Sequence, residues 1–203
     1  LRSLVGPFFR LERLERALAE LFEIAGIDNR FDRTVTRFYV GASDQDRREH
    51  VLFGDTPFRD VPISRAVQAS AAFSPAFHPV EIDGRFYEDG AVTQTSNFGE
   101  AFERGATLTL VVDPFLPHVS SVRGAASRGS VFYQVDQIVR TMSFTRFEEA
   151  RAHMIRKHPE VSMYTFLPSN RLRHLLAENP LDDRNYLEIW RAAYLSTYAR
   201  LMR

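Results

Sequence analysis

A short stretch that ends in Asp89-Gly90 constrains this chain more than any other part of it. The run Val80-Glu81-Ile82 is followed by Asp83-Gly84 and then by Arg85-Phe86-Tyr87. An Asp-Gly pair between two β-prone runs favours a tight hairpin turn. Asp89 then comes just past the second strand, and Gly90 after it is expected to adopt backbone angles that are closed to other residues. The stretch therefore predicts a hairpin that holds a carboxylate at a strand end beside a cleft.

The composition describes a neutral globular domain. The chain has 203 residues, of which 44% are hydrophobic, enough to bury a core. Its 26 Lys+Arg balance 26 Asp+Glu, and no basic cluster with interleaved aromatics occurs, so no nucleic-acid partner is expected. The absence of cysteine excludes disulfides, thiolate nucleophiles and Cys-ligated metals. No apolar run approaches the roughly 20 residues of a membrane span, and no signal-peptide pattern is present.

The residues upstream of the hairpin follow a distinctive order. From Val61 the chain reads VPISRAVQASAAFSPAFHPVEIDGRFYEDGAV, which is a helix rich in small residues, a proline-containing bend, the hairpin and then Asp-Gly-Ala. This order resembles the second half of the patatin-like phospholipase domain, over residues 36 to 113. The resemblance implies an α/β fold in which part of a patatin-like sheet is flanked by helices, with an α-helical C-terminal extension. It also implies a lipid ester as substrate.

By this resemblance Asp89 is the aspartate of a Ser-Asp catalytic dyad, and Gly90 and Ala91 shape its turn. In such a dyad the carboxylate takes the proton of a serine hydroxyl as the serine attacks an ester carbonyl. A free aspartate is a weak base with a pKa of about 3.9, so a desolvated setting that raises the pKa favours this role. The aromatic residues expected to provide apolar walls are Phe73, Phe77, Phe86 and Tyr87. No metal or organic cofactor is implied, and the six histidines show no zinc-binding spacing.

The nucleophile of such a dyad is not found in this sequence. No two glycines are four residues apart, so G-x-S-x-G does not occur, and no two are adjacent, so the glycine-rich oxyanion loop is missing too. Gly41-x-Ser43 resembles the front of a nucleophile elbow, but Gln45 stands where glycine is needed, and Ser43 is interpreted as structural. In the family both elements precede the matched segment. The chain is therefore interpreted as the carboxyl-terminal part of the domain, with the other half elsewhere in the protein or on a separate chain, and these residues alone are expected to be inactive.

The remaining periodicities predict two parts. Residues 1–113 are expected to be the C-terminal part of the patatin-like α/β domain and to end in Thr107–Asp113, the best candidate for a buried strand. Residues 114–203 are expected to form a mostly helical extension packed on the same domain, with a loop over 114–129, a strand over 161–167 and helices over 130–158, 170–178 and 183–203. The long helix is expected to carry Val131, Val135, Ile138, Val139, Met142 and Phe147 on or near one side. Asn97 is expected to cap a helix over 98–104.

Two alternatives stay open for function and partners. A patatin-like remnant without a nucleophile would act as a lipid-binding or protein-interaction module instead of an enzyme. The last helix, 183–203, carries aromatic residues over a wide face, which fits either docking into the domain or contact with a membrane surface. Its mixed charges do not form the basic face that is typical of interfacial helices. The resemblance to bacterial patatin-like proteins leaves the bacterial cytoplasm or the membrane periphery as the expected location.

Overall fold

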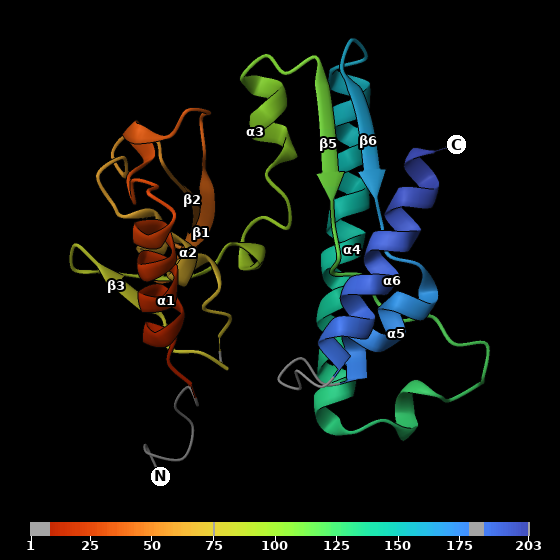
Figure 1. Cartoon of the computed structure of the whole chain (residues 1–203). Helices are drawn as coiled ribbons and strands as arrows, with labels where there is room; N and C mark the ends of the chain where they lie inside the picture. The colour runs from red at the N-terminus through yellow and green to blue at the C-terminus, as the bar shows by residue number, and fades with distance from the viewer. Residues whose placement is uncertain (1–8, 75, 179–184, 203) are drawn as a thin grey trace. The chain divides into compact units, whose positions relative to one another are not determined.

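The computed structural model describes residues 9–74, 76–178 and 185–202, which belong to two compact units. The first unit extends to Thr95 and the second begins at Ser96 (Figure 1). The division therefore falls earlier in the chain than the predicted boundary after residue 113. Mixed helices and strands in both units give the α/β class that the sequence predicts.

An antiparallel sheet with the strand order β2-β1-β4-β3 forms the centre of the first unit. Its elements are α1 (Glu12–Ile24), η2 (Phe31–Arg33), β1 (Val40–Asp44), β2 (Glu49–Phe53), α2 (Ile63–Ser70), β3 (Val80–Ile82), β4 (Arg85–Asp89) and η3 (Gly90–Val92). The predicted hairpin is confirmed, since Val80 pairs with Tyr87 and Ile82 with Arg85. Asp83 and Gly84 both have positive φ, 51° and 74°, as a two-residue hairpin turn of this kind requires.

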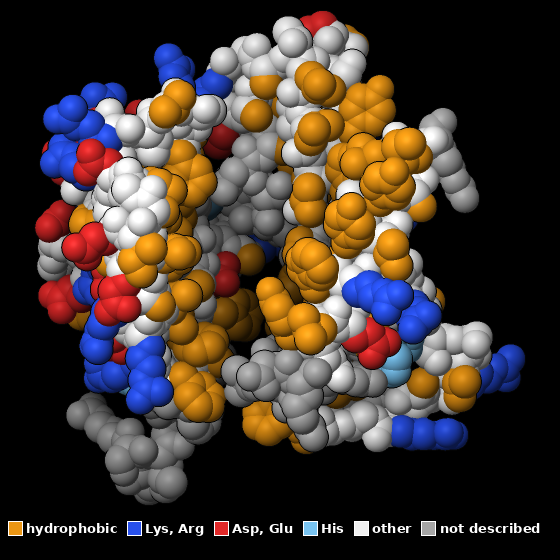
Figure 2. Space-filling view, in the orientation of Figure 1, with side chains coloured by type: hydrophobic (Ala, Val, Ile, Leu, Met, Phe, Trp, Pro, Cys, Tyr) orange, Lys and Arg blue, Asp and Glu red, His pale blue; other side chains and the backbone are white. Residues whose placement is uncertain are grey.

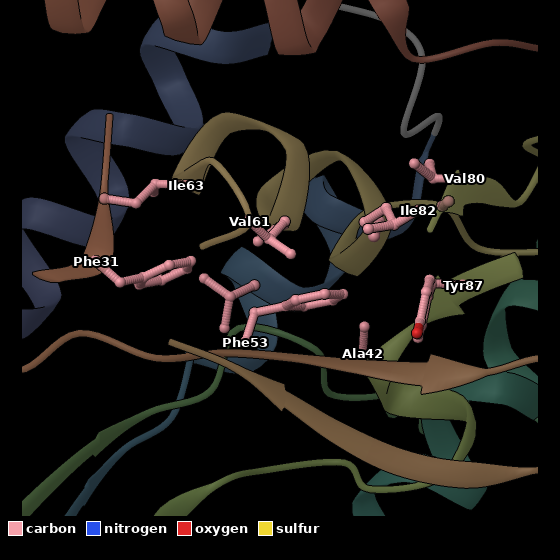
Figure 3. Packing of buried hydrophobic residues seen from close by; sticks show 12 residues of the cluster. Phe31, Ala42, Phe53, Val61, Ile63, Val80, Ile82 and Tyr87 are labelled. Carbon is pink, nitrogen blue, oxygen red and sulfur yellow. The ribbon is translucent and has the colours of Figure 1, made fainter. Parts of the chain in front are cut away.

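The core of the first unit lies between this sheet and α2 (Figure 3). Ala66 and Ala69 of α2 and Ala42 of β1 are completely buried, and their small side chains allow the helix to approach the sheet closely. Phe53 contacts Tyr87 edge to face, with ring centroids 5.3 Å apart. Since β1 lies between β2 and β4, this packing holds the end of β4 in a fixed place.

In the second unit two parallel strands pack against helices. Its elements are α3 (Phe98–Glu103), β5 (Leu108–Val112), η4 (Ala126–Arg128), α4 (Val131–Lys157), β6 (Ser162–Phe166), α5 (Asn170–Glu178) and α6 (Tyr186–Leu201). The register runs from Leu108 opposite Ser162 to Val112 opposite Phe166. The core of this unit is formed by Phe98, Phe102, Val111, Phe147 and Met154. The predicted loop, strand and helices after residue 113 are all present; Asn179, Pro180 and the first part of the predicted last helix lie outside the described residues.

The predicted burial of the strand over Thr107–Asp113 is wrong. β5 is not buried on both faces: Thr109 and Val111 are buried, whereas Leu108, Leu110 and Val112 are exposed. The sequence shows only that the strand is apolar, and among the described residues β6 is its single strand neighbour, with helices packed on one side.

The long helix α4 also turns an unexpected face inward. Gln137, Arg140, Ser143 and Phe147 are buried, whereas Val131, Val135, Ile138 and Met142 from the apolar side are exposed. Arg140 tolerates burial because it donates to Asp136 at 2.8 Å and its guanidinium lies 4.4 Å above the centre of the Phe115 ring. Periodicity alone could not predict this exchange, because it depends on polar partners from other elements.

The last helix, α6, presents its aromatic residues to the outside. Trp190, Tyr194 and Tyr198 stack in a row with ring centroids 6.0 and 6.1 Å apart, and all three are more than half exposed. Figure 2 shows hydrophobic side chains gathered on the visible face of the second unit. No helix in the described ranges is both long enough and apolar enough to span a membrane. At α3, Asn97 occupies the N-cap position without a side-chain hydrogen bond, so the predicted cap is not formed.

Candidate active site

Asp89 is the last residue of β4, whereas the sequence predicts that it comes just past the end of the strand. It pairs with Ala42 of the central strand β1, and its backbone N–H donates to the carbonyl oxygen of Ala72 at 3.1 Å. The chain then turns at once into the 3-10 helix η3. The carboxylate is thus attached to a strand end that is fixed by both β1 and the segment after α2.

One oxygen of the Asp89 carboxylate is oriented by the turn that follows. Oδ1 accepts the backbone N–H of Ala91 at 2.8 Å, so the side chain caps η3. Among the described residues, no group donates a hydrogen bond to the other oxygen, Oδ2. A carboxylate in this state has one oxygen held in place and one available to accept a proton.

Burial raises the pKa of Asp89 above its usual value. The negative charge of Glu88 raises this pKa further, and the Ala91 N–H acts in the opposite direction. Alternation along β4 puts Glu88 on the other face of the sheet, where it accepts from Arg48 at 3.1 Å. A paired-carboxylate site is therefore not formed, and Asp89 is a single carboxylate in a setting that makes it a stronger base.

Of the four residues expected to provide apolar walls, Phe77 packs against the core of the first unit and Phe73 is partly buried. Tyr87, which alternation places on the same face of β4 as Asp89, belongs to the buried core of the first unit. Phe86 lies on the opposite face and is exposed. The core side of the sheet, and not the outer aromatic residue, therefore shields this end of β4 from water.

Gly90 is required here for a reason other than the one predicted. Its φ is not in the positive region, so no special backbone angle is involved. A Cβ at this position would instead lie 2.7 Å from the carbonyl oxygen of Gly41 in β1. The absent side chain lets the turn pack directly on the central strand.

Ser43, interpreted from the sequence as a structural residue, has a buried and hydrogen-bonded hydroxyl. Its side chain is 1% exposed, and its hydroxyl donates to the carbonyl oxygen of Asp89 at 2.9 Å. The same hydroxyl lies 2.7 Å from Oγ1 of Thr93, which lies 3.2 Å from Nδ1 of His50. Sequence reasoning missed Thr93 and His50. The two predicted strands joined by a short turn are the signal that could have indicated part of this contact, because the pairing of β1 with β2 brings Ser43 opposite His50.

The described residues offer no group of three or more His, Asp or Glu side chains that could hold a metal ion. The site is thus a single oriented carboxylate at the end of an antiparallel strand, followed by a tight glycine turn. Fold and site together define an α/β protein with a single buried, oriented carboxylate at a strand end.

The comparison with protein families agrees with this class. Residues 2–102 match the family described as Patatin-like phospholipase, and the match contains β1 to β4, Asp89 and the η3 turn. The chain belongs to the patatin-like phospholipase family. A comparison with curated proteins gave no match.

Proposed function

We propose that Asp89 is the catalytic base of a lipid acyl hydrolase that works through a Ser-Asp dyad. The observation that carries this proposal is the Asp89 carboxylate itself, with one oxygen oriented by Ala91, the other without a hydrogen-bond donor among the described residues, and a pKa raised by burial. A raised pKa brings a carboxylate closer to the operating pH and strengthens it as a base. The family supports hydrolysis of lipid esters as the reaction class.

The reaction assigns one proton transfer to Asp89 in each step. Asp89 accepts the serine hydroxyl proton as the serine oxygen bonds to the ester carbonyl carbon, and it returns that proton to the alcohol that leaves. A water molecule then attacks the acyl-serine and gives its proton to Asp89. The carboxylate returns that proton to the serine oxygen as the fatty acid leaves, which restores the starting state.

The serine of this dyad belongs, in our proposal, to polypeptide outside these 203 residues. The sequence contains neither G-x-S-x-G nor adjacent glycines, and Ser43 is buried with its proton committed to a carbonyl oxygen. The 203-residue chain by itself is therefore expected to hydrolyse no ester.

Ester hydrolysis by the protein translated from its natural start tests the proposal. Asp89→Asn keeps the shape of the side chain and removes the base, so kcat is expected to fall about 10²- to 10⁴-fold. Asp113→Asn is the matched control: Asp113 also lies at a strand end, accepts an N–H two residues on at 2.8 Å and has a pKa raised by burial, but it lies outside the family match. Full activity in Asp89→Asn, or equal losses in both variants, would reject Asp89 as the base.

A second candidate function rests on the exposed aromatic face of α6. A patatin-like module that binds a lipid surface would use rings with polar tips, such as Trp190 and Tyr194, which are exposed here. Trp190 is the single tryptophan of the chain, so its fluorescence reports directly on this face. For this function, phosphatidylcholine vesicles should shift its emission to the blue in both the parent chain and Asp89→Asn. No shift in the parent chain would exclude the module.

A further inference from the structure

Three side chains from separate segments form a continuous hydrogen-bonded row that ends on Asp89. Ser43 belongs to β1 and His50 to β2, and Thr93 follows η3. The row runs from His50 Nδ1 to Thr93 Oγ1 at 3.2 Å, from there to Ser43 Oγ at 2.7 Å, and from Ser43 to the Asp89 carbonyl oxygen at 2.9 Å. None of the three side chains contacts the Asp89 carboxylate in the described structure.

The chemistry of the last acceptor sets the direction of every bond in the row. A carbonyl oxygen only accepts, so the single hydroxyl proton of Ser43 goes to Asp89. The Thr93 hydroxyl also lies 3.4 Å from the Gly90 carbonyl oxygen, but its contact with Ser43 is much shorter at 2.7 Å, so its proton is assigned to Ser43. His50 then donates to Thr93 through Nδ1–H. The row thus selects one neutral tautomer of His50, with the proton on Nδ1.

Apart from the pairing of β4 with β1, the row supplies one of three hydrogen bonds that hold Asp89 among the described residues. The backbone N–H of Asp89 donates to Ala72, and the carboxylate accepts from the N–H of Ala91. Both of these contacts use partner groups of the backbone, whereas the contact to the Asp89 carbonyl comes from the Ser43 side chain. The Asp89 carbonyl group lies in the Asp89–Gly90 peptide plane, so the hydrogen bond from Ser43 fixes that plane. The next peptide, Gly90–Ala91, carries the N–H that orients the Asp89 carboxylate.

We propose that Ser43, supported by Thr93 and His50, is a positioning residue that fixes the Asp89–Gly90 peptide and thereby the direction of the Asp89 carboxylate. This inference rests on the proposed function, because the role of Asp89 as base is what gives the orientation a catalytic meaning. Ser43 touches neither substrate nor reacting atoms and acts only through Asp89. A carboxylate that turns away from its partner by a small distance loses much of its effect on rate.

The first test measures amide hydrogen exchange on the 203-residue chain. In Ser43→Ala the Ala91 amide is expected to exchange about tenfold faster, the effect of losing one typical buried hydrogen bond. The matched control is Ser64→Ala, which removes another fully buried hydroxyl of the first unit; that hydroxyl lies 2.9 Å from Glu15 and 2.8 Å from Asn29. The control should leave the Ala91 amide unchanged, and Ser43→Thr, which keeps the hydroxyl, should restore its protection.

The second test measures the tautomer of His50, which a general loss of stability would not change. Imidazole ¹⁵N chemical shifts distinguish the two neutral tautomers, and His50 is expected to carry its proton on Nδ1 in the parent chain. Thr93→Val removes the hydroxyl between His50 and Ser43 and should abolish this preference, while Ser64→Ala should keep it. A proton on Nε2 in the parent chain, or equal Ala91 exchange in Ser43→Ala and the parent, would overturn the proposal.

Kinetics of the protein translated from its natural start separate this inference from the proposed function. Ser43→Ala should lower kcat about tenfold at unchanged KM, since substrate binding does not involve Ser43. A parent protein without esterase activity would refute the proposed function while the exchange and tautomer results still decide the positioning role. An unchanged kcat in Ser43→Ala, with Asp89→Asn strongly impaired, would refute the positioning role alone.

Discussion

Gly90→Ala tests the close contact between the η3 turn and the central strand. The new Cβ would lie 2.7 Å from the Gly41 carbonyl oxygen and 2.9 Å from its carbon, where ordinary contact begins at 3.4 Å. Both neighbours are backbone atoms of β1, which is bonded to β2 and β4 and cannot move alone. An added methyl group in a packed core destabilises by about 1–3 kcal/mol. With rigid neighbours, we expect the upper half of this range.

Urea unfolding followed by the amide signals of β1 and β4 measures the effect. A loss of about 2 kcal/mol should lower the midpoint by about 1 M, given a slope of about 2 kcal/mol/M for a unit of this size. Gly99→Ala is the control, because Gly99 lies inside α3 and has room for a Cβ. Its added Cβ would have only the Met154 Cε atom at 3.8 Å nearby, so helix propensity should stabilise α3 by about 0.5–1 kcal/mol. An unchanged midpoint in Gly90→Ala would refute the argument from close approach.

Three other predictions concern stability. Because the pKa of folded Asp89 is raised, the folded state holds the proton more tightly than the unfolded chain does, and the ionised carboxylate destabilises the fold near neutral pH. Asp89→Asn should therefore raise the free energy of unfolding near neutral pH. This gain should vanish as the pH falls below about 3.9, where the carboxyl group is protonated in both states. Burial and the nearby His174 lower the pKa of His118, so the second unit should lose stability as the pH falls below about 6.5. His118→Gln should reduce this loss, which thermal melts followed by Trp190 fluorescence would measure. Phe53→Ala removes a completely buried ring from the first core and should destabilise that unit by about 3–5 kcal/mol, which amide exchange in β2 would reveal.

Local sequence signals predicted the parts of the first unit that hold the candidate base. The Asp83-Gly84 pair predicted the hairpin, because only a turn with two positive φ values joins strands so closely. The helix Asn170–Glu178 also has the predicted bounds. These features depend on neighbouring residues, so the sequence contains the information that determines them.

Burial in the second unit and the role of Gly90 depend on partners distant in sequence. Arg140 is buried because its guanidinium lies over the Phe115 ring and donates to the carbonyl oxygen of Leu176 at 3.3 Å, and a count of apolar residues along α4 cannot include these contacts. Gly90 is needed because β1 passes close to it, and that contact follows from the register of β1 on β4. The row from His50 to Asp89 depends on the same register.

Covalent labelling of the protein translated from its natural start, with a serine-directed fluorophosphonate, tests the central claim most directly. The account predicts one labelled serine, located by mass spectrometry outside these 203 residues, and labelling that is strongly slowed by Asp89→Asn but not by Asp113→Asn. A labelled serine within the 203 residues, or labelling that is equally fast in Asp89→Asn, would contradict the assignment of Asp89 as the base of a nucleophile supplied from elsewhere.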